Sequence, residues 1–216
     1  MAGTAIVGAG VMGETLLAGL VRAGWAASDL IAADRRPTRL AEIEARHCVR
    51  TGTTSDAVSA ADTVVLVVKP QDVREVLPEI RDALRPGALV VSLCAGVHTE
   101  QLEARLPDGT PVVRVMPNTP AQVAEGMAAI SAGAHAQQEH LDRVTAIMAA
   151  VGKVVTVPER YQDAVTAISG SGPAYLFFVV EAMIDAGVML GLPRDIATTL
   201  VSQTMYGSAK LLIDSG

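Results

Sequence analysis

Residues 8–13 read Gly8-Ala9-Gly10-Val11-Met12-Gly13, a glycine loop between an apolar segment and a helical pattern. Thr4–Gly8 has the composition of a buried strand, and Met12–Ala23 has the periodicity of a helix. In such a loop the first glycine permits a tight turn, the second lets a phosphate approach the backbone, and the third lets the helix pack closely on the strand. Amides at the helix N-terminus then face the phosphates. The loop therefore predicts a dinucleotide site.

The rest of the first 157 residues alternates between apolar runs and helical patterns. Strands are predicted at Leu30–Asp34, Thr63–Val68, Leu89–Ser92, Pro111–Val115, Met127–Ile130 and Lys153–Val157. Helices are predicted at Thr38–Ala45, Asp72–Leu84, a segment with Thr99 as N-cap, and Glu139–Ala150. This alternation is typical of a Rossmann-like α/β fold, a doubly wound and mostly parallel sheet. Ligands of such sheets bind beyond the carboxyl ends of the strands.

After Tyr161 the predicted strands end and three helices follow. They cover Tyr161–Ser169, Ala174–Leu190 and Arg194–Asp214, with a break at Gly170-Ser171-Gly172-Pro173. Ala174–Leu190 is apolar nearly all round, so it must be buried, and we infer a subunit interface. We therefore expect a dinucleotide-binding domain over residues 1–158 and an all-α domain over residues 159–216.

Composition excludes several classes of function. A net charge of −6 and an aromatic content of 3% argue against nucleic acid as a partner. Glu181 and Asp185 interrupt the longest apolar helix, and Met1–Thr4 lacks a basic n-region, so we expect neither a membrane span nor a signal peptide. Two cysteines and four histidines without metal spacing fit a metal-free cytoplasmic protein. The expected partners are a small-molecule substrate and other copies of the chain.

The end of the second predicted strand carries an acid followed by two arginines. Asp34 suits the ribose 2′-hydroxyl of NAD, whereas Arg35 suits the 2′-phosphate of NADP. We favour NADP, with NAD as the second cofactor. The alternative is that Arg35 and Arg36 are solvated surface charges.

Three further loops should reach the same crevice. Lys69 ends the most buried strand and would hold oxygens of cofactor or substrate, unless its alkyl chain only covers the strand edge. Cys94 begins a small-residue turn against which a cofactor could lie, and it reads as a packing residue rather than a nucleophile. Asn118 lies in the proline-stiffened loop Met116–Pro120 and would position groups near a nicotinamide, although a plain turn explains it equally well.

Together these motifs resemble the Δ1-pyrroline-5-carboxylate reductase family, over the whole chain. The resemblance depends on Gly8–Gly13, Val67-Val68-Lys69-Pro70, Ala95-Gly96-Val97, Met116–Pro120, Ser169-Gly170-Ser171-Gly172-Pro173-Ala174-Tyr175, Gly191-Leu192-Pro193 and Gly207-Ser208-Ala209-Lys210. The resemblance implies an NAD(P)H-dependent oxidoreductase of proline biosynthesis that reduces the C=N bond of 1-pyrroline-5-carboxylate to L-proline. It also implies a homodimer through the C-terminal helices, assembled into a larger ring such as a decamer.

The resemblance also implies the site residues. The cofactor contacts would be Gly8, Ala9, Gly10, Val11, Met12, Gly13, Asp34, Arg35, Thr54, Val67, Val68, Lys69, Pro70, Cys94 and Ala95. The catalytic residues would be Lys69, Asn118 and Ser171. Geometry and charge should do most of the work, because the site must hold two rings face to face and capture one carboxylate.

Members of this family continue with a Ser-Pro-Gly-Gly-Thr-Thr stretch that serves the substrate, and this sequence ends at Gly216 before it. We therefore expect the helical domain to be incomplete at its C-terminus. Two alternatives remain open at this point: a non-catalytic dinucleotide-binding module, and a relative of the β-hydroxyacid dehydrogenases. The second requires a lysine in the helical domain, where this chain offers only Lys210 after Lys153.

Overall fold

The computed structural model describes residues 3–215. Its contacts divide the chain into two compact units, one up to Gly170 and one from Ser171 onward. The predicted boundary between residues 158 and 159 divides the chain by proposed function rather than by compactness, and it remains a proposal.

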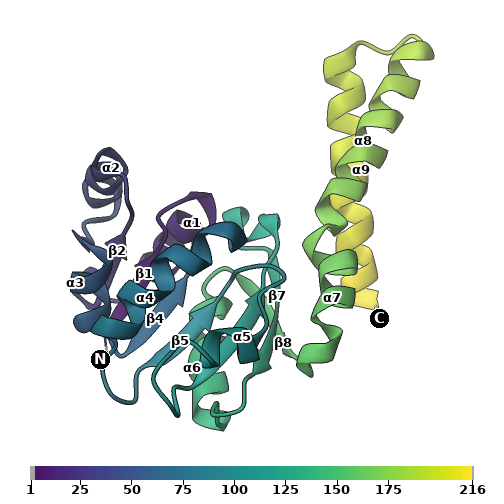
Figure 1. Ribbon diagram of the computed structural model, residues 1–216. Coiled ribbons are helices and arrows are strands. Elements are labelled where there is room, and N and C mark those ends of the chain that lie inside the picture. The colour runs from purple at the N-terminus through teal and green to yellow at the C-terminus, as the bar shows by residue number, and fades with distance from the viewer. Residues whose placement is uncertain (1–2, 216) are drawn as a thin grey trace. The chain divides into compact units, whose positions relative to one another are not determined.

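The first unit is built on one eight-stranded sheet with the order β3-β2-β1-β4-β5-β6-β7-β8 (Figure 1). Its strands are β1 (Thr4–Val7), β2 (Leu30–Ala33), β3 (Arg50–Gly52), β4 (Thr63–Leu66), β5 (Leu89–Ser92), β6 (Val112–Met116), β7 (Gly126–Ala132) and β8 (Gly152–Thr156). All neighbouring pairs are parallel except β6 and β7. The predicted doubly wound, mostly parallel sheet is confirmed. Because β2 and β4 flank β1, the order reverses there, and such a switch point opens a ligand crevice.

Helices cover both faces of this sheet, as alternation along each strand requires. One face packs against α1 (Val11–Arg22), α2 (Pro37–His47) and α6 (Gln138–Ala149). The other packs against α3 (Thr54–Ser59), α4 (Val73–Ala83) and α5 (Thr99–Glu103). In β1, for example, Ile6 lies in the first core, while Ala5 and Val7 lie in the second. Short helical segments complete the unit: η1 (Ala27–Asp29), η2 (Pro70–Asp72), η3 (Thr119–Val123), η4 (Glu159–Tyr161), α7 (Gln162–Val165) and the π-helical turn η5 (Thr166–Gly170).

Local expectations failed in three places. β3 and α3 were not predicted, because β3 is a three-residue edge strand and α3 is a short helix started by a Thr53–Asp56 capping box. Thr99 is not the N-cap of α5; His98 is, and the Thr99 hydroxyl instead donates to Glu159 Oε2 at 2.6 Å. The predicted break at Gly170–Pro173 shrinks to Ser171, because proline is tolerated in the first turn of a helix.

The second unit is a helical hairpin of α8 (Gly172–Met189) and α9 (Arg194–Ser215). Gly191, with φ of +97°, makes the turn between them. Ile184 and Ala197 are buried, and Arg194 pairs with Asp185 and Glu181. Most other apolar side chains of the hairpin are exposed, including Phe178 at 78%.

One helical stretch, Glu159–Met189, is long and apolar enough, by length and composition alone, to cross a membrane. Its most apolar 18-residue window has a mean hydropathy of 1.4, and only 6% of that window is buried inside the chain. A surface this apolar needs a cover from outside, either lipid or protein.

Candidate active site

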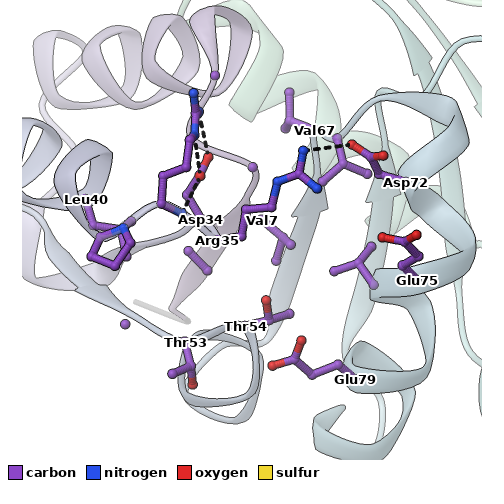
Figure 2. Close-up of a pocket in the computed structure, with 18 of the residues that line it drawn as sticks. Val7, Asp34, Arg35, Leu40, Thr53, Thr54, Val67, Asp72, Glu75 and Glu79 are labelled. Atoms are coloured by element: carbon purple, nitrogen blue, oxygen red, sulfur yellow. Dashed lines mark hydrogen bonds and ion pairs between the residues drawn. The ribbon is translucent and has the colours of Figure 1, made fainter.

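A cleft of about 930 Å³ opens at the carboxyl ends of β1, β2 and β4 (Figure 2). Its walls come from the glycine loop, the turn after β2, the start of α3 and the segment η2–α4. Among the predicted cofactor residues, those that line it are Gly8, Gly10, Asp34, Arg35, Thr54, Val67, Val68 and Lys69. Those that do not are Ala9, Val11, Met12, Gly13, Pro70, Cys94 and Ala95. The cleft thus gathers residues from four separate loops.

The three glycines of the loop have different surroundings. Gly8 has φ of +106°, and a Cβ there would lie 2.4 Å from the carbonyl oxygen of Val67. A Cβ at Gly13 would lie 2.0 Å from the carbonyl oxygen of Gly8, so α1 can pack on β1 only without a side chain. At Gly10 a Cβ would meet no protein atom within 4 Å. Gly8 and Gly13 therefore serve packing, whereas Gly10 leaves room on the cleft side of the loop.

The N-terminus of α1 is suited to an anion. Gly10 is its N-cap and, within residues 3–215, no side chain caps the helix. Its first-turn amides are thus left without a side-chain acceptor, and the helix dipole adds partial positive charge there. A pyrophosphate fits this end, because Gly10 adds no side chain to block its approach.

Asp34 is held by four hydrogen bonds. Its Oδ2 accepts from the Ala9 amide at 3.0 Å and from Arg36 Nη2 at 3.1 Å. Its Oδ1 accepts from the Arg36 amide at 3.0 Å and from Arg36 Nε at 2.9 Å. Burial opposes ionisation, but the bonds from Arg36 and Ala9 outweigh it and lower the pKa of Asp34. Ionised Asp34 therefore connects the glycine loop to the residue that precedes α2.

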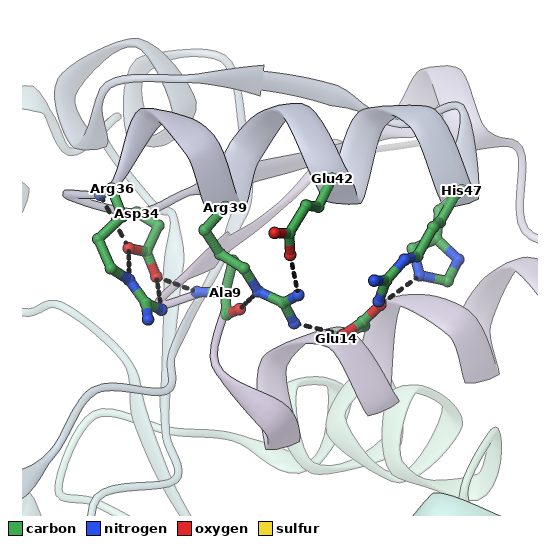
Figure 3. A network of polar contacts seen from close by, with 8 residues as sticks. Ala9, Glu14, Asp34, Arg36, Arg39, Glu42 and His47 are labelled. Atoms are coloured by element: carbon green, nitrogen blue, oxygen red, sulfur yellow. Dashed lines mark hydrogen bonds and ion pairs between the residues drawn. The ribbon is translucent and has the colours of Figure 1, made fainter.

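A second polar network joins α1 to α2 (Figure 3). Glu14, in the first turn of α1, accepts from Arg39, from Arg46 Nη1 at 2.9 Å and from His47 Nε2 at 3.1 Å. Arg39 also donates through Nε to the Ala9 carbonyl at 2.7 Å. Burial would raise the pKa of Glu14, but the bonds from Arg39, His47 and Arg46 lower it to about 2. Both polar backbone groups of Ala9 are thus used inside the protein, which explains why this predicted contact does not line the cleft.

Arg35 takes no part in the hydrogen bonds around Asp34. Its side chain is 78% exposed and reaches from the turn after β2 toward Asp72, with 3.9 Å between Nη2 and Oδ2 (Figure 2). Thr54 lines the cleft at the first residue of α3. Lys69 is exposed and lines the cleft just beyond β4.

Cys94 is not among the residues that line the cleft. Its thiol is buried and donates to the carbonyl oxygen of Val68 at 3.3 Å, and burial raises its pKa. A buried, protonated thiol is a poor nucleophile, so the interpretation of Cys94 as a packing residue agrees with its surroundings. Ala95, the next residue, is exposed.

The side chain of Asn118 joins three segments of the first unit. Its Oδ1 accepts from the Met127 amide at 2.8 Å, and its Nδ2 donates to the Ser169 carbonyl at 3.2 Å. It thereby ties the loop after β6 to β7 and to the π-helical turn η5. Ser171 belongs to the second unit, where it precedes α8.

A buried arginine that the sequence did not single out anchors η4. Arg114 in β6 is only 2% exposed, and its Nη1 donates to Glu159 Oε1 at 3.2 Å. The Thr99 amide and hydroxyl donate to the same carboxylate, at 2.9 Å and 2.6 Å. Burial opposes the ionisation of Glu159, but these bonds prevail and lower its pKa. An arginine in the middle of an apolar strand was the one available signal, because such a side chain is buried only when paired.

Two family models match the chain. Residues 4–96 match the family described as "NADP oxidoreductase coenzyme F420-dependent". Residues 159–216 match the family described as "Pyrroline-5-carboxylate reductase dimerisation".

Individual relatives extend over almost the entire chain. The pyrroline-5-carboxylate reductase of Mycobacterium tuberculosis (strain ATCC 25618 / H37Rv) is 45% identical over 220 residues, which cover 99% of this chain and 75% of the relative. A solved pyrroline-5-carboxylate reductase from Coxiella burnetii superposes with a TM-score of 0.94 at 32% identity, covering 99% of this chain and 80% of that one. A Plasmodium falciparum pyrroline carboxylate reductase with NADP bound superposes with a TM-score of 0.88 at 29% identity, covering 98% and 78%.

Proposed function

This chain belongs to the pyrroline-5-carboxylate reductase family, and from that premise we propose how its residues bind the cofactor and serve the reaction. The enzyme is an NAD(P)H-dependent oxidoreductase that reduces the C=N bond of 1-pyrroline-5-carboxylate to L-proline, the last step of proline biosynthesis. The observation that carries this conclusion is the 45% identity over 99% of the chain. A non-catalytic module and a β-hydroxyacid dehydrogenase, the two alternatives, are not favoured by these relatives.

NADP is the cofactor of this family, and the cleft fits it. When bound, NADPH supplies the hydride for the C=N bond. The first turn of α1 would hold the pyrophosphate, Gly10 would allow its approach, and Arg35 and Arg36 would face the ribose end. Thr54, Val67 and Val68 would line the remainder of the nucleotide.

The catalytic assignments to Lys69, Asn118 and Ser171 follow from the family motifs and from position. Lys69 would place a positive charge at the mouth of the cleft, where it attracts phosphate or carboxylate oxygens. Asn118 would act by fixing the loop after β6, because its amide is already bonded to Met127 and Ser169. Ser171 would offer a hydroxyl to the substrate.

The helices from residue 159 onward would form the subunit interface. This region matches the family's dimerisation model, and its apolar side chains are exposed in the single chain. We therefore assign the cover of Glu159–Met189 to protein rather than lipid. We propose a homodimer through α8 and α9, assembly of dimers into a decamer, a division into residues 1–158 and 159–216, and a cytoplasmic location.

The test uses the two glycines whose surroundings differ. The purified protein should oxidise NADPH with 1-pyrroline-5-carboxylate and form proline. Gly10→Ala should lose NADPH binding, measured by fluorescence titration, at an unchanged melting temperature, because its Cβ meets no protein atom. Gly13→Ala should lose NADPH binding and also have a lower melting temperature, because its Cβ would lie 2.0 Å from the Gly8 carbonyl oxygen. Undiminished NADPH binding by Gly10→Ala would refute the placement of the pyrophosphate.

A further inference from the structure

Asp34 occupies the position where an acid normally accepts a hydrogen bond from the ribose 2′-hydroxyl of NAD. An ionised carboxylate offers about four acceptor positions. Here four donors fill them, two on each oxygen, and Arg36 supplies three of the four. A 2′-hydroxyl could bind Asp34 only by displacing one of these bonds. The feature that would favour NADH is therefore blocked by an interaction within the chain.

The charge at this corner follows the same pairing. A 2′-phosphate carries about −1.5 to −2 charges at neutral pH, so a free Asp34 carboxylate would repel it. The Arg36 guanidinium lies on Asp34 in a bidentate pair and cancels that charge. Arg36 also lines the cleft with a half-exposed side chain, and its Nη1 atom carries two further N–H groups. It can thus neutralise the acid and present donors to the phosphate at once.

The opposite wall of the cleft strengthens this conclusion. The described lining residues on that wall, formed by η2 and α4, include Asp72, Glu75 and Glu79, which repel a phosphate. Lys69 lies beyond β4, and Arg35 reaches toward Asp72 across the cleft (Figure 2). Arg36 is held beside the end of β2 by its bonds to Asp34.

We propose that Arg36, by saturating and neutralising Asp34, determines the preference of this enzyme for the 2′-phosphate of NADPH over the 2′-hydroxyl of NADH. The proposal depends on the cofactor cleft of the proposed function. Arg35, its neighbour in sequence, adds attraction for the phosphate but does not control Asp34, and this difference provides the matched control.

The experiment measures dissociation constants for NADPH and NADH by fluorescence titration without the imine substrate, so turnover plays no part. Arg36→Ala should weaken NADPH about tenfold or more, as expected for the loss of charged hydrogen bonds, and should tighten NADH several-fold. Arg35→Ala should weaken NADPH only and leave NADH unchanged. In the double variant Asp34→Asn with Arg36→Ala, the gain for NADH should shrink and part of the NADPH affinity should return, because the freed carboxylate is gone. If Arg36→Ala unfolds, Arg36→Gln replaces it, because glutamine keeps amide donors without the charge. Arg36→Gln should also weaken NADPH binding and tighten NADH binding.

Equal losses for both cofactors in the Arg36 variants, or no gain for NADH, would overturn the proposal. A wild-type protein that binds NADPH while these variants behave like Arg35→Ala would overturn this inference alone. A wild-type protein that binds neither dinucleotide would refute the cleft assignment itself and this inference with it.

Discussion

Glu14 lies in the first turn of α1, where the positive end of the helix dipole already favours a carboxylate. Burial would raise its pKa, but hydrogen bonds from Arg39, His47 and Arg46 lower it from 4.5 to about 2. A lowered pKa stabilises the fold fully above pH 4.5, and this contribution is lost as the pH falls from 4.5 toward 2. Because the pairs are partly exposed, we expect Glu14→Gln to cost about 1 kcal/mol at pH 7.

The pH dependence separates this effect from a general loss of packing. Thermal melts should show that the gap between wild type and Glu14→Gln narrows as the pH falls below 4.5. Glu42→Gln is the matched control, because Glu42 bonds Arg39 from a half-exposed position and should change stability little at any pH. A gap that stays constant down to pH 2.5 would contradict the role assigned to Glu14.

At the scale of elements, the loop after β6 is held in place by one amide side chain. Asn118→Ala removes the bonds to the Met127 amide and the Ser169 carbonyl, and leaves both groups without this partner. We expect a loss of about 1–3 kcal/mol in the free energy of unfolding, measured by urea titration. We also expect kcat to fall more than NADPH affinity, because the cofactor cleft does not include Asn118.

Two variants show which bond matters. Asn118→Asp keeps the acceptor for Met127 but sets an oxygen against the Ser169 carbonyl, so it should behave like Asn118→Ala. Ser169→Ala leaves that carbonyl in place and removes only the hydroxyl, which lies 3.5 Å from Asn118 Nδ2, so the stability of this variant should stay near wild type. If Ser169→Ala were less stable than Asn118→Asp, the Ser169 hydroxyl rather than the Ser169 carbonyl would be the important partner of Asn118.

At the scale of the whole molecule, the exposed apolar side chains of α8 and α9 demand a partner. Sedimentation at micromolar concentration should give a dimer or a larger species. Phe178→Asp places a charge at a 78% exposed apolar position of α8 and should shift the protein to monomer. Val123→Asp, at a 71% exposed apolar position of the first unit, should leave the assembly intact. A Phe178→Asp protein that still sediments like wild type would place the interface elsewhere.

Features that depend only on neighbouring residues could be predicted from the sequence. The glycine loop, the alternation of strands and helices, and the helix that is apolar nearly all round can each be recognised in a short window of sequence, because backbone freedom and periodic burial are local properties. Short elements such as β3 and α3 were not predicted, because segments of three to six residues carry too little periodicity.

The use of the site side chains depends on contacts between distant parts of the chain. Asp34 and the Ala9 amide are 25 residues apart, and Asn118 and Ser169 are 51 apart, so no window of sequence contains either bond. The sequence pointed to Arg35 for the 2′-phosphate, yet in the fold Arg35 reaches toward Asp72 and Arg36 lies on Asp34. The partner of each arginine depends on which chain segments the folded sheet brings together. The proposed preference for NADPH depends on the same arrangement.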